Sequence, residues 1–235
     1  MNQNGKIFLI PMLLGETEPE KVLPRTVFEI VKETDYYIVE NLKTARRFIS
    51  GLKLGKNISE LTFFELNKRT EEKQLSEFIE PAKQGKNIGI ISEAGCPGIA
   101  DPGSEIVKLA HRNNIDVVPL VGPSSILLAL ISSGASGQNF AFNGYIPIKE
   151  PERSAKIKFL ENRAEKEQQS QIFMETPFRN SKIIEDVLKV CKPQTMFTIA
   201  ANITTENEFI KSKTISEWKK NVPKIDKIPA IFIIF

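Results

Sequence analysis

The sequence predicts an α/β protein with two domains, the first of them built on a mostly parallel sheet. Short apolar runs alternate with helical patterns up to residue 133, and this alternation is typical of parallel strands joined by helices. The pattern changes after Gly144, where a charged stretch over 149–171 precedes a second group of strands. We therefore expect an N-terminal α/β domain over 1–121 and a C-terminal α/β domain over 122–235.

The expected elements of the first domain follow one another closely. Strands are expected where β-branched and aromatic residues cluster, at 6–10, 36–40, 62–66, 88–92 and 116–121. Helices are expected at 24–33, 44–52, 71–84 and 104–113. Val27, Ile30 and Val31 have helical spacing in the first of these helices. Gly85 is the expected stop of the third helix, and Ser104 is the expected N-cap of the fourth.

The second domain is expected to begin with a strongly apolar helix at 124–133, which ends at Gly134. A charged, exposed helix is expected at 149–171 and a shorter helix at 181–190. Strands are expected at 172–175, 195–202 and 230–235, and the segment 206–215 is expected to form a hairpin or strand pair.

Composition excludes several classes of protein. The chain has 235 residues, enough for a large core, and its net charge of +3 neither requires nor excludes a nucleic-acid partner. Two distant cysteines and a single histidine do not make a usual metal cluster, so no metal is expected. The longest apolar run, 126–131, is far shorter than the ~18 residues of a membrane span, and no targeting pattern is visible. We expect a cytoplasmic protein with free thiols and no membrane association.

The most informative segment is the loop that follows the expected strand at 88–92. Residues 92–103 are rich in Gly and Pro, and a helical pattern begins directly after them. Connections between a strand and a helix usually have ~2–6 residues, so this longer loop indicates binding. The carboxyl end of a strand is also where α/β proteins bind ligands. Cys96 lies in this loop and is expected to be a small buried side chain.

Five segments of the chain resemble one family, and they occur in the family's order. Residues 92–103, SEAGCPGIADPG, resemble the signature S-D-A-G-x-P-x-I-x-D-P-G of the small-subunit ribosomal RNA cytidine 2′-O-methyltransferases. These enzymes are one group of the tetrapyrrole-methylase fold. Residues 118–125 resemble V-P-x-P-G-P-S-A, residues 142–147 resemble F-x-G-F-L-P, and residues 174–179 resemble Y-E-S-P-H-R. Residues 23–35 have the spacing of the family's first helix.

The resemblance implies the two-domain tetrapyrrole methylase fold, with a mixed sheet in the C-terminal domain. It also implies S-adenosylmethionine as cofactor in a cleft between the domains, ribosomal RNA or the small ribosomal subunit as partner, and a homodimer. The residues expected to bind the cofactor are Ser92, Glu93, Ala94, Gly95, Ala100, Asp101, Gly122, Ser124, Ser125, Met174 and Ala201. The residues expected to act in catalysis are Glu175, Glu40 and Arg25.

A ribose hydroxyl becomes a good nucleophile only if a group accepts its proton during the attack. Glu40, Glu93 and Glu175 are the candidate acceptors, and each is otherwise a solvated or capping carboxylate. Glu40 and Glu175 match family positions at strand ends. Glu175 is expected to end a strand and face the cleft. Asp101 is expected to brace its own loop through backbone N–H groups rather than take part in the chemistry.

Basic and aromatic residues offer the contacts that RNA would need. Arg25, Arg153 and Arg179 match basic positions of the family, and an arginine can bind a phosphate through two nitrogens. Arg153 lies in a charged run and is more simply a charge on a helix surface. The lysine-rich segment 211–227 is either a solvated face or a surface that attracts RNA. Tyr145 is the best candidate for stacking on a base.

Departures from the family pattern keep other functions open. Only Pro11 and Gly15 remain of the family's first loop, Asn41 and Leu42 follow Glu40 in place of D-T, and Phe178 replaces a histidine. The alternatives are methylation of a small, tetrapyrrole-like molecule and a non-catalytic protein that only binds the cofactor. Neither G-x-G-x-x-G nor G-x-x-x-x-G-K-[ST] is present, which disfavours hydride transfer and nucleotide hydrolysis.

Overall fold

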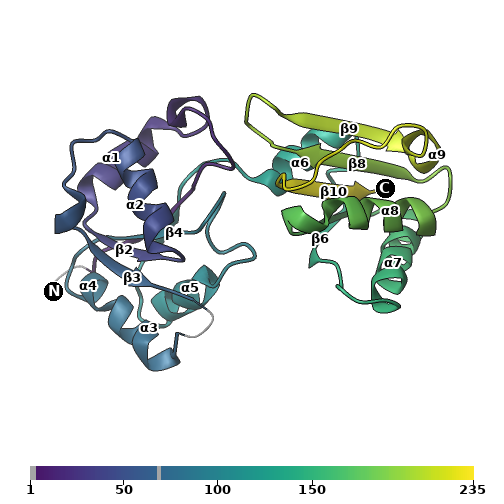
Figure 1. Ribbon diagram of the computed structural model, residues 1–235. Coiled ribbons are helices and arrows are strands. Elements are labelled where there is room, and N and C mark those ends of the chain that lie inside the picture. Colours follow the sequence, from purple (N-terminus) through teal and green to yellow (C-terminus); the bar gives the residue numbers. More distant parts are fainter. Residues whose placement is uncertain (1–3, 68–69) are drawn as a thin grey trace. The chain divides into compact units, whose positions relative to one another are not determined.

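The computed structural model describes residues 4–67 and 70–235 and divides the chain into two compact units (Figure 1). Unit 1 is Met1–Ser124 and unit 2 is Ser125–Phe235. Each unit contains one five-stranded sheet, parallel in unit 1 and mixed in unit 2. The predicted fold class is therefore confirmed.

All neighbouring strands in the sheet of unit 1 are parallel. Their order is β3-β2-β4-β1-β5. The bounds are β1 Ile7–Ile10, β2 Tyr36–Val39, β3 Thr62–Glu65, β4 Ile88–Ile91 and β5 Val117–Pro119. The central strand β4 is buried along its whole length, which explains its continuous apolar run. Because the strands are parallel, the loops that follow them leave from the same edge of the sheet.

Helices cover both faces of this sheet. The helices are α1 Arg25–Glu33, α2 Leu42–Gly51, α3 Glu72–Phe78, α4 Glu80–Lys83 and α5 Gly103–Arg112, with short 3₁₀ turns at Pro19–Lys21 and Ile58–Glu60. Side chains of α1 and α2 share one hydrophobic cluster with Phe8 and Tyr37. Side chains of α3, α4 and α5 share another cluster with Ile7 and Ile38. Consecutive strand residues thus point to opposite faces, as a pleated strand requires.

Two predictions for unit 1 are wrong in detail. The single helix expected at 71–84 is two helices, because the chain turns at Ile79 and Pro81 lies in the first turn of α4. Proline has no N–H to donate, so it suits a helix start rather than a helix interior. The helix expected to be capped by Ser104 begins one residue earlier, at Gly103. Its N-cap is Pro102, which has no side chain able to accept a hydrogen bond, and the Gly103 N–H donates instead to the carboxylate of Asp101, just before the cap, at 2.7 Å.

Unit 2 has a mixed sheet with the order β6-β7-β10-β8-β9. The strands are β6 Phe140–Tyr145, β7 Ser170–Met174, β8 Met196–Ala201, β9 Phe209–Thr214 and β10 Ala230–Ile234. The pair β6–β7 is parallel and the other pairs are antiparallel. The helices are α6 Ser125–Ser133, α7 Glu152–Glu167, α8 Asn180–Val190 and α9 Ile215–Trp218, and a 3₁₀ turn covers Pro177–Arg179. Helices α7, α8 and α9 form one hydrophobic core with one face of the sheet.

The structure corrects several predictions for unit 2. The sequence analysis did not predict strand β6, nor helix α9. The helix expected at 149–171 ends at Glu167, and the following strand begins at Ser170 rather than at 172. The segment 206–215 contains one strand, β9, which pairs with β8 and not within the segment. In the described parts of both units, no helix is long and apolar enough to cross a membrane.

Candidate functional site

Three loops meet at the carboxyl edge of the sheet in unit 1. The loop after β1 and the loop after β4 are joined by the Met12 N–H, which donates to the Gly95 carbonyl at 2.8 Å. The Cys96 thiol lies 3.5 Å from the carbonyl oxygen of Pro123, in the turn that follows β5. The structure therefore brings the Gly- and Pro-rich loop 92–103 together with the turn that contains the expected cofactor residues Gly122 and Ser124.

Asp101 fixes the shape of the loop after β4. Its two carboxylate oxygens accept from the Gly98 N–H at 3.0 and 2.8 Å, and one of them also accepts from Gly103. Burial raises the pKa of this carboxyl, and the backbone donors counteract that effect in part. Ala100, directly before it, has a φ of +63°, an unfavourable conformation for a residue with a side chain. The expectation that Asp101 braces its own loop is confirmed.

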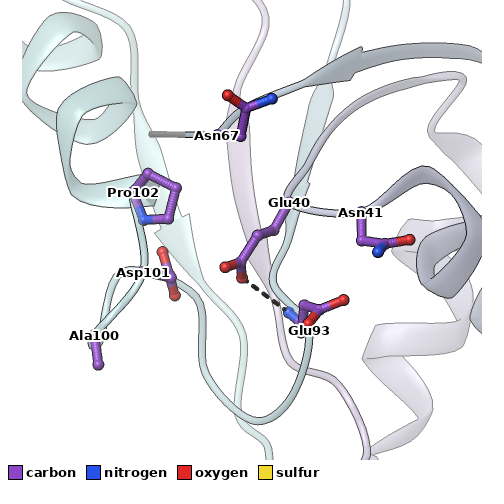
Figure 2. Close-up of a pocket in the computed structure, with 7 residues that line it drawn as sticks. All are labelled: Glu40, Asn41, Asn67, Glu93, Ala100, Asp101 and Pro102. Carbon is purple, nitrogen blue, oxygen red and sulfur yellow. Dashed lines mark hydrogen bonds between the residues drawn. The ribbon is translucent and has the colours of Figure 1, made fainter. Parts of the chain in front are cut away.

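A pocket of about 730 Å³ opens between this loop and the ends of β2 and β3 (Figure 2). Four of its lining residues are among those expected to bind the cofactor or act in catalysis, namely Glu40, Glu93, Ala100 and Asp101. The Glu93 N–H is 3.4 Å from Glu40 Oε2, and the Thr44 hydroxyl is 3.3 Å from Glu93 Oε1. Figure 2 shows the carboxylates of Glu40 and Asp101 projecting into the same space.

The sequence analysis gave no role to the three other residues of the pocket wall, Asn41, Asn67 and Pro102. Asn41 caps α2, since its side-chain oxygen accepts from the N–H groups of Lys43 at 3.0 Å and Thr44 at 3.1 Å. An asparagine before a helical pattern is a capping signal, and it marks the start of α2 at Leu42 rather than at 44. Asn67 follows β3 and reaches the pocket only because β3 pairs with β2, which no local motif reveals.

The packing and the backbone conformation at this edge favour glycine at positions 122 and 95. A Cβ atom on Gly122 would lie 2.2 Å from Pro11 Cγ and 2.3 Å from Pro11 Cβ, so the turn after β5 requires glycine. Gly95 has a φ of +67°, which disfavours other residues, and a Cβ there would lie 3.2 Å from Leu14 Cδ2. Close approach of a ligand to either backbone remains a prediction.

Several of the expected cofactor residues lie near this edge but outside the pocket wall. Ser92 is buried, and its hydroxyl is 3.4 Å from the Ala94 carbonyl. Ser124 ends unit 1 and Ser125 begins α6. The pocket wall does not include Ser92, Ala94, Gly95, Gly122, Ser124 or Ser125.

The surroundings of Arg25 and Cys96 limit the roles that these two side chains can have in a reaction. Arg25 is exposed at the first position of α1 and forms an ion pair with Glu29 at 3.0 Å. It does not line the pocket. Cys96 is half-buried, and burial raises the pKa of its thiol. The protonated thiol is therefore favoured at neutral pH, and Cys96 is a packing residue of the loop rather than a nucleophile.

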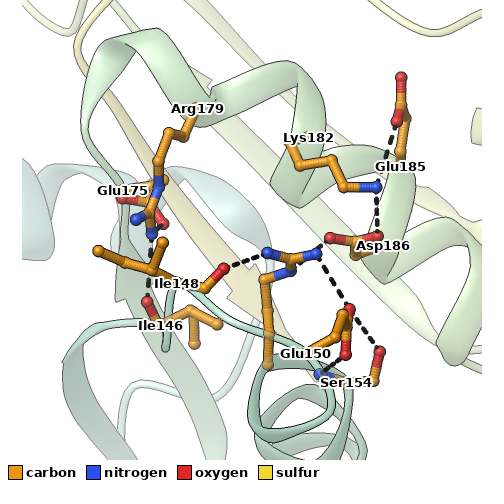
Figure 3. A network of polar contacts seen from close by, with 10 residues as sticks. Ile146, Ile148, Glu150, Ser154, Glu175, Arg179, Lys182, Glu185 and Asp186 are labelled. Carbon is orange, nitrogen blue, oxygen red and sulfur yellow. Dashed lines mark hydrogen bonds and ion pairs between the residues drawn. The ribbon is translucent and has the colours of Figure 1, made fainter.

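In unit 2, Glu175 and its ion-pair partner Arg179 connect the family-like segment 174–179 with the family-like segment 142–147. Glu175 is buried directly after β7 and forms an ion pair with Arg179 (Figure 3). One carboxylate oxygen also accepts from the Thr176 N–H at 2.6 Å, and Arg179 donates to the Ile146 carbonyl at 3.3 Å. Glu175 thus ties the turn after β7 to the end of β6. The expected orientation toward a cleft is not visible in these contacts.

Two further predicted residues lie at the same edge of this sheet. Met174 pairs with Ile231 and Ala201 pairs with Ala230, so the two residues flank the start of β10. Both belong to a part of the sheet that is largely apolar, and Ala201 is buried.

Arg153 differs from the simple prediction of a helix-surface charge. Its side chain is 13% exposed and lies 2.6 Å from Asp186 on α8 and 3.0 Å from Glu150. It also donates to the Ile148 carbonyl. The prediction is wrong because the partner carboxylate belongs to a helix that packs on α7, a contact that the charged run 149–171 does not indicate.

A parallel sheet with a long Gly- and Pro-rich loop at its carboxyl edge, followed by a mixed-sheet unit, defines a two-domain α/β enzyme class. The model of the family "Tetrapyrrole (Corrin/Porphyrin) Methylases" matches residues 25–219. The chain therefore belongs to this family, and it is a methyltransferase.

Named relatives and solved structures agree with this family. Ribosomal RNA small subunit methyltransferase I of Haemophilus influenzae is 35% identical over 98% of this chain and 78% of its own length. The protein of the same name from Thermotoga maritima is 27% identical over 93% of this chain and 94% of its own length. The structure of the methyltransferase CobJ has a TM-score of 0.63 at 16% identity, covering 98% of this chain and 93% of CobJ. Uroporphyrin-III-C-methyltransferase from Thermus thermophilus has a TM-score of 0.57 at 16% identity, covering 98% and 94%.

Proposed function

We propose that this methyltransferase uses S-adenosylmethionine to methylate the ribose 2′-oxygen of a cytidine in small-subunit ribosomal RNA. The observation that carries the proposal is the 35% identity, over 98% of the chain, to a protein named for methylation of small-subunit ribosomal RNA. The family-like segments at 92–103, 118–125, 142–147 and 174–179 support the finer assignment to a cytidine 2′-oxygen.

The polar groups at the carboxyl edge of the sheet in unit 1 suit S-adenosylmethionine as a ligand. When bound, S-adenosylmethionine supplies a methyl group attached to a positively charged sulfur. Glu40, Glu93 and Asp101 give the pocket wall an acidic character, which favours a cation and ligands rich in hydroxyl and amino groups. The Gly95 carbonyl already accepts from the Met12 N–H, and the Gly98 N–H already donates to Asp101, so other backbone groups of the loop after β4 are the ones proposed to bind the adenine. Met174 and Ala201, both in unit 2, remain proposed cofactor-binding residues.

Glu40 is the proposed proton acceptor. Its carboxylate is half-buried and borders an open pocket, so a ribose hydroxyl can reach it. Glu175 has a different proposed role, because its carboxylate is occupied by Arg179 and the Thr176 N–H. It positions the turn after β7. Arg25 remains a proposed phosphate contact, since its exposed guanidinium can exchange Glu29 for a phosphate.

A methyl-transfer assay with defined acceptors tests the proposal. The purified chain is incubated with S-adenosylmethionine labelled in the methyl group and with small ribosomal subunits that lack the modification. A porphyrin precursor serves as the competing acceptor. Label in ribose-methylated cytidine supports the proposal, and label in the tetrapyrrole supports the small-molecule alternative. Calorimetric binding of the cofactor without transfer to either acceptor would contradict both assignments and indicate a different acceptor.

Two further expectations belong to this proposal. We infer that the protein acts in the cytoplasm, where ribosomal subunits are available, and that it works as a homodimer. Sedimentation equilibrium of the purified chain, whose mass is 26.5 kDa, tests the second expectation, because a dimer has twice this mass.

A further inference from the structure

We propose that unit 2 carries a stacking platform for unpaired bases, formed by Tyr145, Ile148 and Phe178. The inference rests on the proposed RNA substrate and adds a surface that recognises it. The three side chains are 57%, 67% and 77% exposed, although they are large and apolar. Tyr145 and Phe178 come from neighbouring parts of the backbone, because Tyr145 pairs with Met174 at the ends of the parallel strands β6 and β7. Phe178 lies in the 3₁₀ turn that follows β7.

Ion pairs and hydrogen bonds beneath the platform fix its backbone. Arg179, next to Phe178, donates to the carbonyl of Ile146. Arg153 donates to the carbonyl of Ile148 and is itself paired with Asp186 (Figure 3). The loop after β6 and the turn after β7 are therefore held by the partly buried side chains of Arg153 and Arg179, while their own apolar residues are exposed. A surface fixed before binding loses less conformational entropy when a ligand arrives.

The charge around the platform favours a nucleic acid as the ligand. The segment 211–227 contains six lysines and two acidic residues, a net charge of +4, whereas the whole chain carries +3. Lys227 at the end of this segment adjoins the platform, since its N–H donates to the carbonyl of Pro177 at 3.0 Å. Lys149 directly follows Ile148. Within residues 4–67 and 70–235, no ion pair involves Lys149 or Lys227, so both remain available for phosphates.

Aromatic faces flanked by lysines suit single-stranded RNA in particular. Bases in a duplex are stacked on one another, whereas unpaired bases stack on aromatic side chains while lysines contact the backbone phosphates. The platform therefore recognises nucleotides in an unpaired region of the substrate RNA.

Binding of a short fluorescent single-stranded RNA to the full chain, measured by anisotropy, tests the platform. Phe178→Ala should weaken binding by about five- to one-hundredfold, the range of one lost base stack. Phe178→Trp should restore binding to within about threefold of the wild type, because it keeps an aromatic face. Phe159→Ala is the matched control, since Phe159 is 50% exposed and belongs to α7 rather than to the loop after β6 or the turn after β7, and it should bind as the wild type does.

Salt dependence and turnover separate this proposal from the proposed function. Lys227→Gln should reduce the slope of log affinity against log salt by about 0.7, the value for one phosphate contact on a single strand. With ribosomal subunits as acceptor, Phe178→Ala should raise KM and leave cofactor affinity unchanged. Unchanged RNA binding by Phe178→Ala, or equal losses for Phe178→Ala and Phe159→Ala, would overturn the platform even if methylation occurs. Loss of RNA binding by Phe178→Ala alone supports the platform even if no methyl transfer is found.

Discussion

Replacing Glu175 by glutamine tests whether this carboxylate holds the turn after β7 in place. Its side chain is 2% exposed, and that of its partner Arg179 is 27% exposed. Removing one partner of a buried ion pair costs ~3–5 kcal/mol, because the remaining charge stays in a poorly solvated site. Arg179 reaches solvent in part and retains its bond to the Ile146 carbonyl. We therefore expect a smaller loss, about 2 kcal/mol, in the free energy of unfolding of unit 2.

The chain contains a suitable probe for this measurement. Trp218 is the only tryptophan, and it is buried in the core of unit 2. Its fluorescence during urea unfolding therefore reports on unit 2. Glu185→Gln is the matched control, because it removes an exposed carboxylate 3.8 Å from Lys182, a pair worth ~0–1 kcal/mol. Adding Arg179→Gln to the Glu175→Gln protein should recover part of the loss, since no unpaired charge then remains.

The outcome also bears on the role of Glu175 in the reaction. A positioning residue should leave cofactor affinity within about tenfold, equal to ~1.4 kcal/mol, while turnover falls. If the Glu175→Gln and Glu185→Gln proteins unfold at the same urea concentration, the reasoning from the ion pair is refuted. The reasoning is also refuted if adding Arg179→Gln lowers the stability of the Glu175→Gln protein by as much as Arg179→Gln alone lowers that of the wild type.

Three other changes probe unit 1. Gly122→Ala should destabilise the protein by ~1–3 kcal/mol, because the new Cβ would clash with Pro11. Adding Pro11→Gly should relieve part of this loss. An unchanged midpoint of thermal unfolding, measured by circular dichroism, would contradict this. Glu40→Gln should lower kcat about a hundredfold at saturating cofactor without a change in thermal stability, and normal turnover would exclude Glu40 as the proton acceptor. Cys96 should react slowly with iodoacetamide at pH 7 and faster as the pH rises, because burial raises the pKa of its thiol and so reduces the fraction of thiolate. Fast modification at pH 7 would disprove this.

The strands of unit 1 were predictable from sequence because burial on both faces leaves a continuous apolar run. This is clearest for β4, Ile88–Ile91. Strand β6 in unit 2 was not predictable in the same way. It contains Asn143 and Gly144, its pairing with β7 shifts between Phe142 and Tyr145, and none of its residues is fully buried. Such an irregular strand shows neither an apolar run nor a clean alternation.

Other errors left a signal in the sequence that could have corrected them. Pro81 inside the expected helix at 71–84 marks the start of α4. Thr214 and Glu217 form a capping box that marks the start of α9. The helix expected at 149–171 is different, because it ends at Glu167 and its C-cap, Gln168, has a left-handed conformation although it is not a glycine.

The candidate site shows the same division between local and distant contacts. The loop 92–103 and the bracing role of Asp101 follow from consecutive residues, and so were predictable. Asn67 enters the pocket wall through strand pairing, and Arg153 is buried by Asp186, which lies 33 positions later in the chain. These contacts depend on the tertiary fold, which spacing in the sequence does not encode.

The most direct test of the central claim is mass spectrometry of small-subunit ribosomal RNA from cells with and without this protein. Ribosomal RNA from a deletion strain is digested to nucleosides and short fragments, and compared with that of the parent and of the deletion strain that carries the intact gene. The account predicts that one ribose-methylated cytidine is absent in the deletion strain and returns with the intact gene, but not with a Glu40→Gln copy. Identical ribose methylation in all four samples would contradict the claim that this chain methylates ribosomal RNA.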